Sequence, residues 1–184
     1  PPTLCISVFG KIPDVSKTAT ADFKKSDSVI CLVGKLDNSL GGSIFYQVNN
    51  VLGNSVPKVD LKILPKVFIA INKAITSGEV LSVHDVSEGG LITAIFEMCV
   101  GGNMGARIHL EGVKAHLRGE DFLFNETAGC FVIEVESEKV AEQLFKTVPY
   151  KVIGKTVEGN KIEIYRNTLK LFAADIDKLK KAWQ

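Results

Sequence analysis

Residues 90–100, GLITAIFEMCV, constrain the fold more than any other part of the chain. Their pattern predicts a helix that is apolar nearly all round, with Thr93 and Glu97 marking a narrow polar stripe. Such a helix is stable only when other elements cover most of its surface. The chain has 184 residues, 46% of them hydrophobic and 23% charged, which is enough to build a sizeable core around this helix.

Shorter patterns on both sides of this helix predict the other elements. Apolar, β-branched runs predict strands at residues 4–9, 29–33, 80–83, 107–110, 130–135, 151–154 and 161–165. Helical spacing predicts helices at residues 43–51, at 65–77, after Ser137, and from Phe172 to Trp183. This mixed order predicts an α+β fold, an α/β sandwich in which helices pack on a mixed sheet. We expect one domain over residues 1–184, cut from a longer polypeptide because the chain opens at Pro1 rather than at methionine.

Composition narrows the classes of function. The net charge is +1, from 22 basic and 21 acidic residues, and no long block of like charge occurs, so we expect neither nucleic-acid nor membrane binding. No apolar run approaches the length of a membrane span. The four cysteines lie far apart in apolar runs, without C-x-x-C or zinc-ligand spacing, which predicts buried thiols in a reducing compartment, the cytoplasm.

The first candidate site is SVHDVSEGGL, residues 82–91, which joins a predicted strand to the apolar helix and contains His84. Unpaired N–H groups at a helix N-terminus suit phosphate, and Gly89 and its neighbour would let a ligand approach the backbone. Asp85 and Glu88 could hold Mg²⁺ against phosphates, because magnesium prefers oxygen ligands. Alternatively, Ser87 or Asp85 simply caps the helix and the glycines ease packing.

Two further loops are candidates. Residues 37–43, DNSLGGS, offer the N–H groups of Gly41 and Gly42 and the Ser43 hydroxyl to phosphate, although no Walker lysine follows. In residues 121–129, DFLFNETAG, Glu126 would bind a ligand hydroxyl or a metal, or else pair with Arg118 or face water. Because the chain has no G-x-S-x-G elbow and no cysteine–histidine pair, we expect it to hold no catalytic residue.

The segments PPTLCISVFGKIPDVSK, DSVICLVG, LGGSIFYQ, SVHDVSEGGLITAIFEM and LFNETAGCFVIEV, in this order, resemble the second C-terminal domain of the phosphoribosylformylglycinamidine synthase family. The resemblance implies the fold of the aminoimidazole ribonucleotide synthetase C-terminal domain. It also implies a nucleotide or phosphate site, with Asp85 as the Mg²⁺ ligand. Asn125-Glu126-Thr127 departs from the Glu-Ser-Gln segment of the family's other repeat, which contacts substrate. The residues assigned to the site are Gly41, Gly42, Ser43, His84, Asp85, Ser87, Gly89 and Glu126.

The resemblance further implies an ATP- and Mg²⁺-dependent ligase of purine biosynthesis, which converts formylglycinamide ribonucleotide to the amidine with ammonia derived from glutamine. This domain would form one wall of the nucleotide cleft and would be inactive alone. Its partners would be the N-terminal domains of the same polypeptide and a glutaminase. Two alternatives remain. One is a related ATP-dependent enzyme of the thiamine monophosphate kinase, selenophosphate synthetase or hydrogenase maturation type. The other is a non-catalytic ligand-binding module of the same fold.

Overall fold

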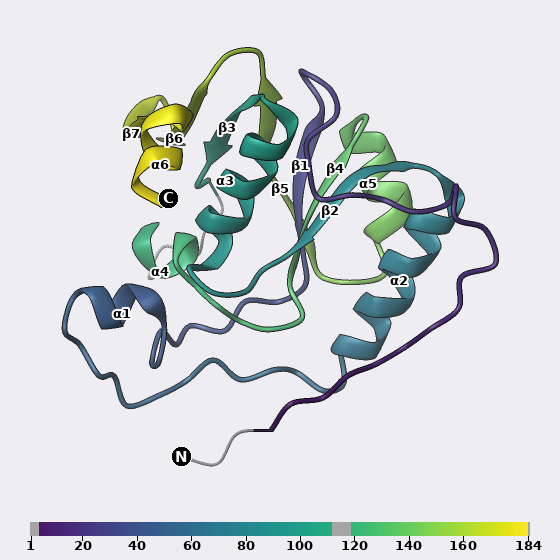
Figure 1. Cartoon of the computed structure of the whole chain (residues 1–184), viewed down its shortest axis with the longest axis horizontal. Helices are drawn as coiled ribbons and strands as arrows, with labels where there is room; N and C mark the ends of the chain where they lie inside the picture. The colour runs from purple at the N-terminus through teal and green to yellow at the C-terminus, as the bar shows by residue number, and fades with distance from the viewer. Residues whose placement is uncertain (1–3, 112–118, 184) are drawn as a thin grey trace.

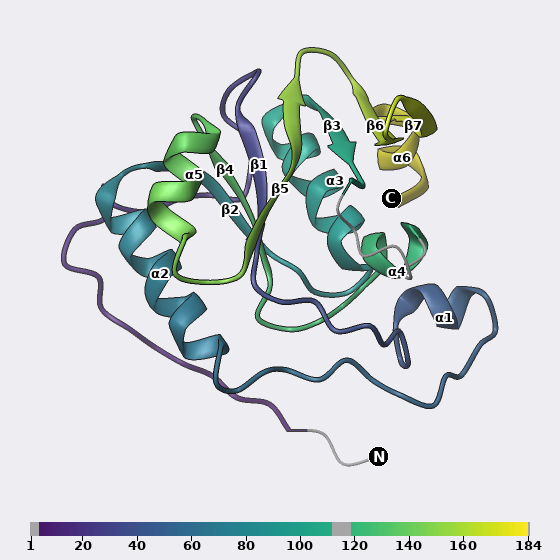
Figure 2. The same ribbon diagram turned by 180° about the vertical axis from the view of Figure 1, so that it is seen from behind.

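The computed structural model describes residues 4–111 and 119–183. Seven strands in these two ranges form one sheet with the order β2-β4-β1-β5-β3-β6-β7 (Figures 1 and 2). The strands are β1 (Val29–Val33), β2 (Val80–Asp85), β3 (Gly105–His109), β4 (Phe131–Val135), β5 (Tyr150–Val157), β6 (Lys161–Arg166) and β7 (Leu169–Asp175). The helices are α1 (Ile44–Val48), α2 (Leu64–Ser77), α3 (Gly90–Gly102), α4 (Gly119–Leu123), α5 (Glu138–Phe145) and α6 (Ile176–Trp183). β3 and β6 are paired in parallel and the other neighbours are antiparallel, so the predicted mixed sheet is confirmed.

Helices cover both faces of the sheet and give the molecule three layers (Figure 1). α2 and α5 lie on one face, where Val67 and Phe145 pack against the strands. α3, α4 and α6 lie on the other face, around Ile95 and Phe122. All five residues of β1 are buried, because successive side chains point to opposite faces and both faces are covered.

The predicted core helix is present as α3. Leu91, Ile95 and Met98 have no exposed surface. Ile92 and Phe96, on its outer side, line a pocket of about 370 Å³ together with side chains of α6. The helix is therefore buried against the sheet, while its outer apolar side borders an open groove.

Local signals place the ends of two other helices correctly. α2 has Pro65 in its first turn and ends before Gly78, whose φ of 79° is a left-handed conformation that glycine adopts without steric cost. α5 begins after Ser137, whose side chain accepts a hydrogen bond from the Val140 N–H. Both boundaries follow from the chemistry of single residues, so the sequence alone predicts them.

The strand predicted at residues 4–9 is wrong. This segment has no regular secondary structure and joins no sheet, and its apolar side chains are exposed. None of residues 4–13 forms a backbone hydrogen bond with another described residue. The pattern indicated a buried apolar strand, but among the described residues the segment has no neighbouring strand that would bury it.

The helix predicted from Phe172 is also wrong at its start. Leu169–Asp175 forms β7, in which Phe172 pairs with Ile164 of β6, and helix α6 begins only at Ile176. Asn167, at a φ of 55°, turns the chain between the two strands. The helical spacing of Phe172 and Ile176 was coincidental, because pairing with β6 decides the structure of this segment.

None of the helices in the described ranges is long and apolar enough to cross a membrane.

A buried carboxylate ties the segment before β1 to the sheet. Glu134 of β4 has no exposed surface. Its two oxygens accept hydrogen bonds from the backbone N–H groups of Lys24 (2.9 Å) and Lys25 (3.1 Å). They also accept bonds from the hydroxyls of Ser28 (2.6 Å) and Ser82 (2.8 Å). Four donors offset the cost of removing a carboxylate from water, so Glu134 fixes where the chain enters β1.

We predict that α3 contains the slowest-exchanging amides of the chain. Leu91, Ala94, Ile95, Met98 and Cys99 are buried in the core, so the amides of residues 91–99 can exchange only when the α3 layer opens. In contrast, α6 lies largely at the surface. Hydrogen–deuterium exchange of the isolated chain, read by mass spectrometry or NMR, checks this. Exchange of residues 91–99 as fast as that of α6 would contradict the layered core.

We predict that Glu134→Ala lowers the free energy of unfolding by roughly 2–4 kcal/mol, because it leaves buried donors without an acceptor. Glu136→Ala is the matched control, since Glu136 is exposed and only pairs with Lys25 at the surface; it should cost less than about 1 kcal/mol. Urea unfolding of both variants measures the difference. Equal losses would show that the four hydrogen bonds to Glu134 contribute little.

Candidate functional site

Sheet topology brings three loops to one edge of the sheet. β1 and β2 are both antiparallel to β4, which lies between them, so they are parallel to each other. Their carboxyl ends therefore reach the same edge, where β4 begins. The loops at residues 34–43, 86–89 and 124–130 meet there, beside α1 (Figure 1). The carboxyl ends of strands are a common location for ligand sites in sheets of this kind.

Glu126 joins the two glycine-bearing loops. Its Oε1 atom accepts hydrogen bonds from the backbone N–H of Ile44, at the start of α1, and of Gly89, at the start of α3, both at 2.9 Å. The Phe45 ring also stacks on the Phe124 ring, with centroids 4.6 Å apart. The carboxylate thus takes the place at the two helix starts that the sequence suggested for phosphate.

Two buried neighbours hold Glu126 in position. The Asn125 amide donates to the carbonyl oxygens of Asp37 (2.7 Å) and Ser39 (3.3 Å). The Thr127 hydroxyl donates to the Asn125 side chain and accepts from the Asp37 N–H (2.9 Å). Asn125 and Thr127 are 0% and 1% exposed, so they serve the structure and are not available to a ligand. Arg118, the alternative partner considered for Glu126, lies outside the described residues.

The alternative prediction that Ser87 or Asp85 caps α3 is wrong. The N-cap residue is Gly89, with no side-chain cap; the Gly90 N–H donates to the Ser87 carbonyl. Gly90 has a φ of 77°, and a Cβ atom there would lie 2.5 Å from the backbone of Phe124. Gly90 therefore admits the chain's own 124–125 backbone, which removes one reason to expect a ligand there.

Most polar groups of residues 41–43 form hydrogen bonds within the chain. The Gly41 N–H donates to the Ser55 carbonyl at 2.8 Å. The Ser43 hydroxyl accepts from the Tyr46 N–H and caps α1, and Ser43 is 1% exposed. Hydrogen bonds from Ser39 hold the pKa of the Asp37 carboxyl below its usual value. In this loop Gly42 is exposed, and its N–H forms no hydrogen bond with another described residue.

His84 is engaged on both ring nitrogens. Nδ1 lies 2.7 Å from the Asp85 carbonyl oxygen, and Nε2 lies 3.0 Å from a carboxylate oxygen of Glu97 on α3. These contacts fasten the end of β2 to α3. The Asp85 carboxylate, 64% exposed, projects from the sheet edge into solvent. Ser87 and Glu88 follow it and are exposed as well.

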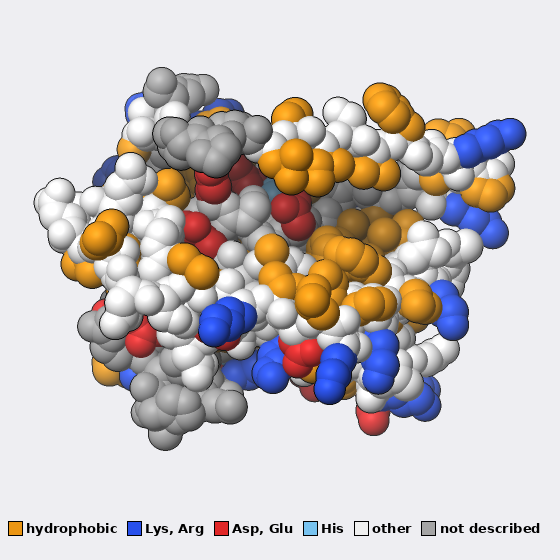
Figure 3. Space-filling view, turned by 90° about the horizontal axis from the view of Figure 1, so that it is seen from below, with side chains coloured by type: hydrophobic (Ala, Val, Ile, Leu, Met, Phe, Trp, Pro, Cys, Tyr) orange, Lys and Arg blue, Asp and Glu red, His pale blue; other side chains and the backbone are white. Residues whose placement is uncertain are grey.

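The exposed groups around this edge include the carboxylates of Asp85 and Glu88 and the ammonium group of Lys35, which lies 3.8 Å from a carboxylate oxygen of Asp60. Figure 3 views the edge end-on and shows acidic side chains around a hollow in the surface. The carboxylates of Asp85 and Glu88 repel bare phosphate and attract a divalent cation.

The donor set suits magnesium only in part. Asp85 offers the oxygen ligand that Mg²⁺ prefers, but no group of three or more histidine, cysteine or acidic residues in the described ranges could hold a metal ion. Mg²⁺ often binds through one or two carboxylates, with water and substrate phosphates as the other ligands. Asp85 fits a shared ion of that kind and does not fit a cage built from protein alone.

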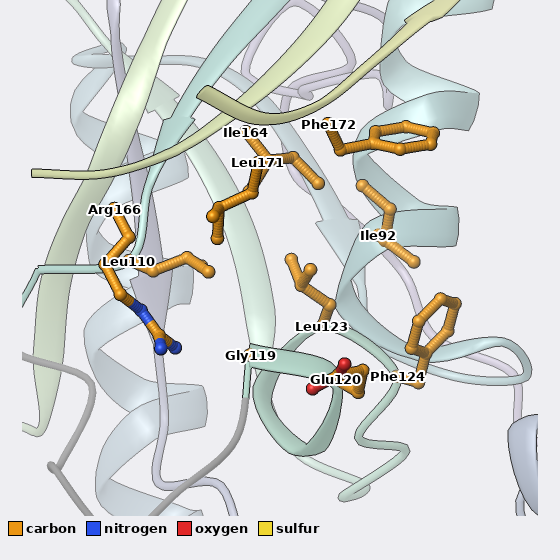
Figure 4. Close-up of a pocket in the computed structure, with 10 residues that line it drawn as sticks. All are labelled: Ile92, Leu110, Gly119, Glu120, Leu123, Phe124, Ile164, Arg166, Leu171 and Phe172. Carbon is orange, nitrogen blue, oxygen red and sulfur yellow. The ribbon is translucent and has the colours of Figure 1, made fainter. Parts of the chain in front are cut away.

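A second pocket, larger than the one between α3 and α6, opens beside the loops on the α3 face of the sheet. It encloses about 470 Å³ between α3, α4, β6 and β7, and its walls are mainly apolar, with Arg166 and Glu120 at the rim (Figure 4). No residue assigned to the phosphate site lines it. This pocket is distinct from the phosphate site predicted from the sequence.

Sequence reasoning thus identified the loops but not what joins them. Glu126 is separated from its partners by 82 and 37 residues, and no local pattern indicates such a contact. Glu97 was visible as the charged residue of an apolar helix, a signal that could have pointed to His84. Asn125 and Thr127 were noticed only as departures from a family segment.

Comparison with known proteins identifies the family. A model of the family "AIR synthase related protein, C-terminal domain" matches residues 25–167. This chain belongs to that family. The phosphoribosylformylglycinamidine synthase subunit PurL of Thermoanaerobacter sp. (strain X514) is 35% identical over 187 aligned residues, which cover all of this chain and 25% of the relative. The chain therefore spans about a quarter of the curated relatives it matches.

Solved structures confirm the AIR synthase related fold. T. maritima PurL complexed with FGAR has a TM-score of 0.73 and 15% identity, over 90% of this chain and 30% of that protein. T. maritima PurL complexed with ATP has a TM-score of 0.71 and 16% identity, over 90% of this chain and 27% of that protein. At these identities the likeness is one of fold.

We predict that Glu126→Ala lowers the free energy of unfolding by about 2 kcal/mol and speeds exchange at the Ile44 and Gly89 amides, because both lose a charged acceptor. Glu126→Gln should cost less, since one amide oxygen can accept both bonds. Glu88→Ala, an exposed change in the adjoining loop, is the control and should leave both amides unchanged. If Glu126→Ala exchanged at the wild-type rate, the two loops would not depend on this carboxylate.

Proposed function

We propose that this chain is the second C-terminal domain of a phosphoribosylformylglycinamidine synthase, an ATP-dependent ligase of purine biosynthesis. The observation that carries the proposal is the match to the Thermoanaerobacter subunit, which runs the full length of this chain at 35% identity. The whole enzyme would amidate formylglycinamide ribonucleotide, with ammonia supplied by a glutaminase partner. Residues 1–184 would act as one domain beside the rest of the same polypeptide, in the cytoplasm.

In this proposal the sheet edge forms one wall of a nucleotide cleft. Asp85 would hold Mg²⁺ against the phosphates, and the Gly42 N–H and the Ser87 hydroxyl would face them. The exposed carboxylates at this edge support a metal-bridged contact, because carboxylates and phosphates approach each other only with a cation between them. Gly41, Ser43, His84, Gly89 and Glu126 would shape the wall rather than touch the ligand, since each is engaged within the chain.

One observation favours a second candidate, a cleft that serves structure rather than turnover. Glu126 already occupies the N–H groups of Ile44 and Gly89, which are the groups that a phosphate would use at these helix starts. In this second candidate the Glu126 carboxylate takes the place of a phosphate, and the domain contributes to the structure of the enzyme without binding nucleotide. Binding of an ATP analogue distinguishes the two candidates: a working cleft loses affinity in Asp85→Asn, whereas a structural module binds no analogue at this edge.

We predict that the isolated chain shows no ATP- and ammonia-dependent turnover of formylglycinamide ribonucleotide. A single wall cannot bring catalytic groups within about 3 Å of the reacting atoms from several sides. Asp85→Asn should change the unfolding free energy of the isolated chain by less than about 0.5 kcal/mol, because this carboxylate is largely exposed. In the full-length synthase the same change should lower turnover.

The control is Glu79→Gln, an exposed change away from the three loops, which should leave turnover of the synthase intact. Turnover by the purified 184-residue chain that disappears in Asp85→Asn would show that the domain is an enzyme by itself, contrary to this proposal.

A further inference from the structure

The N-terminal segment is the clearest unpartnered feature of the molecule. Residues 4–9, LCISVF, have no regular secondary structure, and Ile6, Val8 and Phe9 are 73%, 87% and 94% exposed. Leu4, Ile6 and Val8 alternate with Cys5 and Phe9, so both sides of the segment are largely apolar. A two-sided apolar run is typical of a strand inside a sheet, and natural proteins seldom leave such a run uncovered.

The segment is presented from a fixed base. The Thr20 carbonyl accepts from the Val83 N–H (3.1 Å), and the Phe23 N–H donates to the Met98 carbonyl (3.1 Å). Glu134 holds the next two residues of the chain. Asp14 forms a turn by accepting from the Ser16 N–H and hydroxyl. The chain before this turn runs past the α2 side of the molecule in both ribbon views (Figures 1 and 2).

The comparisons show how much of a related subunit lies outside this chain. The family model begins at residue 25, so the segment lies outside the residues that the model matches. The Thermoanaerobacter subunit nevertheless matches this chain over its whole length, and three quarters of that subunit lie outside the match. The sequence of residues 4–9 is typical of a β-strand, but the segment does not pack on this domain. It could therefore pair with a sheet in another part of such a subunit.

We propose that residues 4–9 form a β-strand that adds to the edge of a sheet in the part of the synthase outside this chain. The inference rests on the proposed function in one respect, that the chain works inside a longer synthase. Backbone hydrogen bonds to the edge strand would supply affinity, and pockets for Ile6 and Val8 would set the register. The strand would also orient the sheet edge that carries Asp85, because the base at residues 20–25 is bonded to β2 and β4.

Cys5 makes this inference measurable. It is exposed, whereas Cys31, Cys99 and Cys130 are buried. Burial also raises the pKa of each of these three thiols to about 12, so they stay protonated and unreactive in the folded chain. In the isolated chain a maleimide should therefore modify Cys5 alone.

The experiment compares the isolated chain with a chimera in which this chain replaces the matched quarter of the Thermoanaerobacter subunit. Peptide mass spectrometry follows modification of Cys5. We expect its rate to fall about 100-fold in the chimera, because a strand inside a sheet reacts only when it detaches. Val8→Lys should restore the rate. Leu61→Lys, a similarly exposed apolar position before α2, is the matched control and should leave Cys5 protected.

Equal Cys5 rates in the chimera and the isolated chain would overturn the proposal. Protection that appears in the isolated chain and grows with its concentration would also overturn it, because a second copy would then be the partner. Deletion of residues 1–13 should leave the melting temperature of the isolated chain unchanged; a clear loss would show that the segment belongs to this domain. A chimera that protects Cys5 without amidating formylglycinamide ribonucleotide would contradict the proposed function and leave the docking strand supported.

Discussion

One carboxylate oxygen controls the edge of the sheet where the three loops meet. Two helices, α1 and α3, begin there, and each leaves backbone N–H groups that need an acceptor. Glu126 supplies that acceptor to both from a single atom, so the loops cannot move independently. The carboxylate is fixed in turn by Asn125 and Thr127, whose side chains are buried against the 37–39 backbone. The positions of Gly42, before α1, and Ser87, before α3, depend on this set of bonds, whereas Asp85 is held by the pairing of β2 with β4.

Elements that depend on local sequence patterns could be predicted, whereas contacts between residues distant in the sequence could not. β1, α2 and α5 follow from patterns completed within a few residues, such as the apolar run of Val29–Val33, Gly78 after α2 and Ser137 before α5. α3 follows from its apolar circumference. β7 does not, because its conformation depends on pairing with β6, which outweighs the helical spacing of Phe172. The bridge through Glu126 does not follow either, since its partners are distant in sequence.

The glycines show how a correct pattern can be given the wrong cause. Gly89 and Gly90 were expected to admit a ligand, and the backbone at Gly90 is indeed approached closely, but by Phe124 and Asn125 of the same chain. Glycine at a helix start therefore indicates that some group contacts the backbone closely, but it does not show whether that group is a ligand or another part of the chain. The motif HDVSEGG is in this respect a joint between β2, α3 and the loop before β4, with His84 and Glu97 as a second fastening.

Charge then decides how a nucleotide could use this edge. With the N–H groups of Ile44 and Gly89 occupied, the exposed groups beside the start of α3 are the carboxylates of Asp85 and Glu88 and the hydroxyl of Ser87, and Lys35 at this edge is paired with Asp60. Two unit charges 4 Å apart interact by about 4 kcal/mol near a protein surface, so a carboxylate beside an unscreened phosphate would oppose binding. A bridging divalent cation reverses that sign and makes Asp85 favourable. If the edge is one wall of a nucleotide cleft, as proposed, further cations and N–H donors for the phosphate oxygens would come from the opposite wall. In that proposal the orientation of the domain against the rest of the synthase would determine whether the edge binds nucleotide.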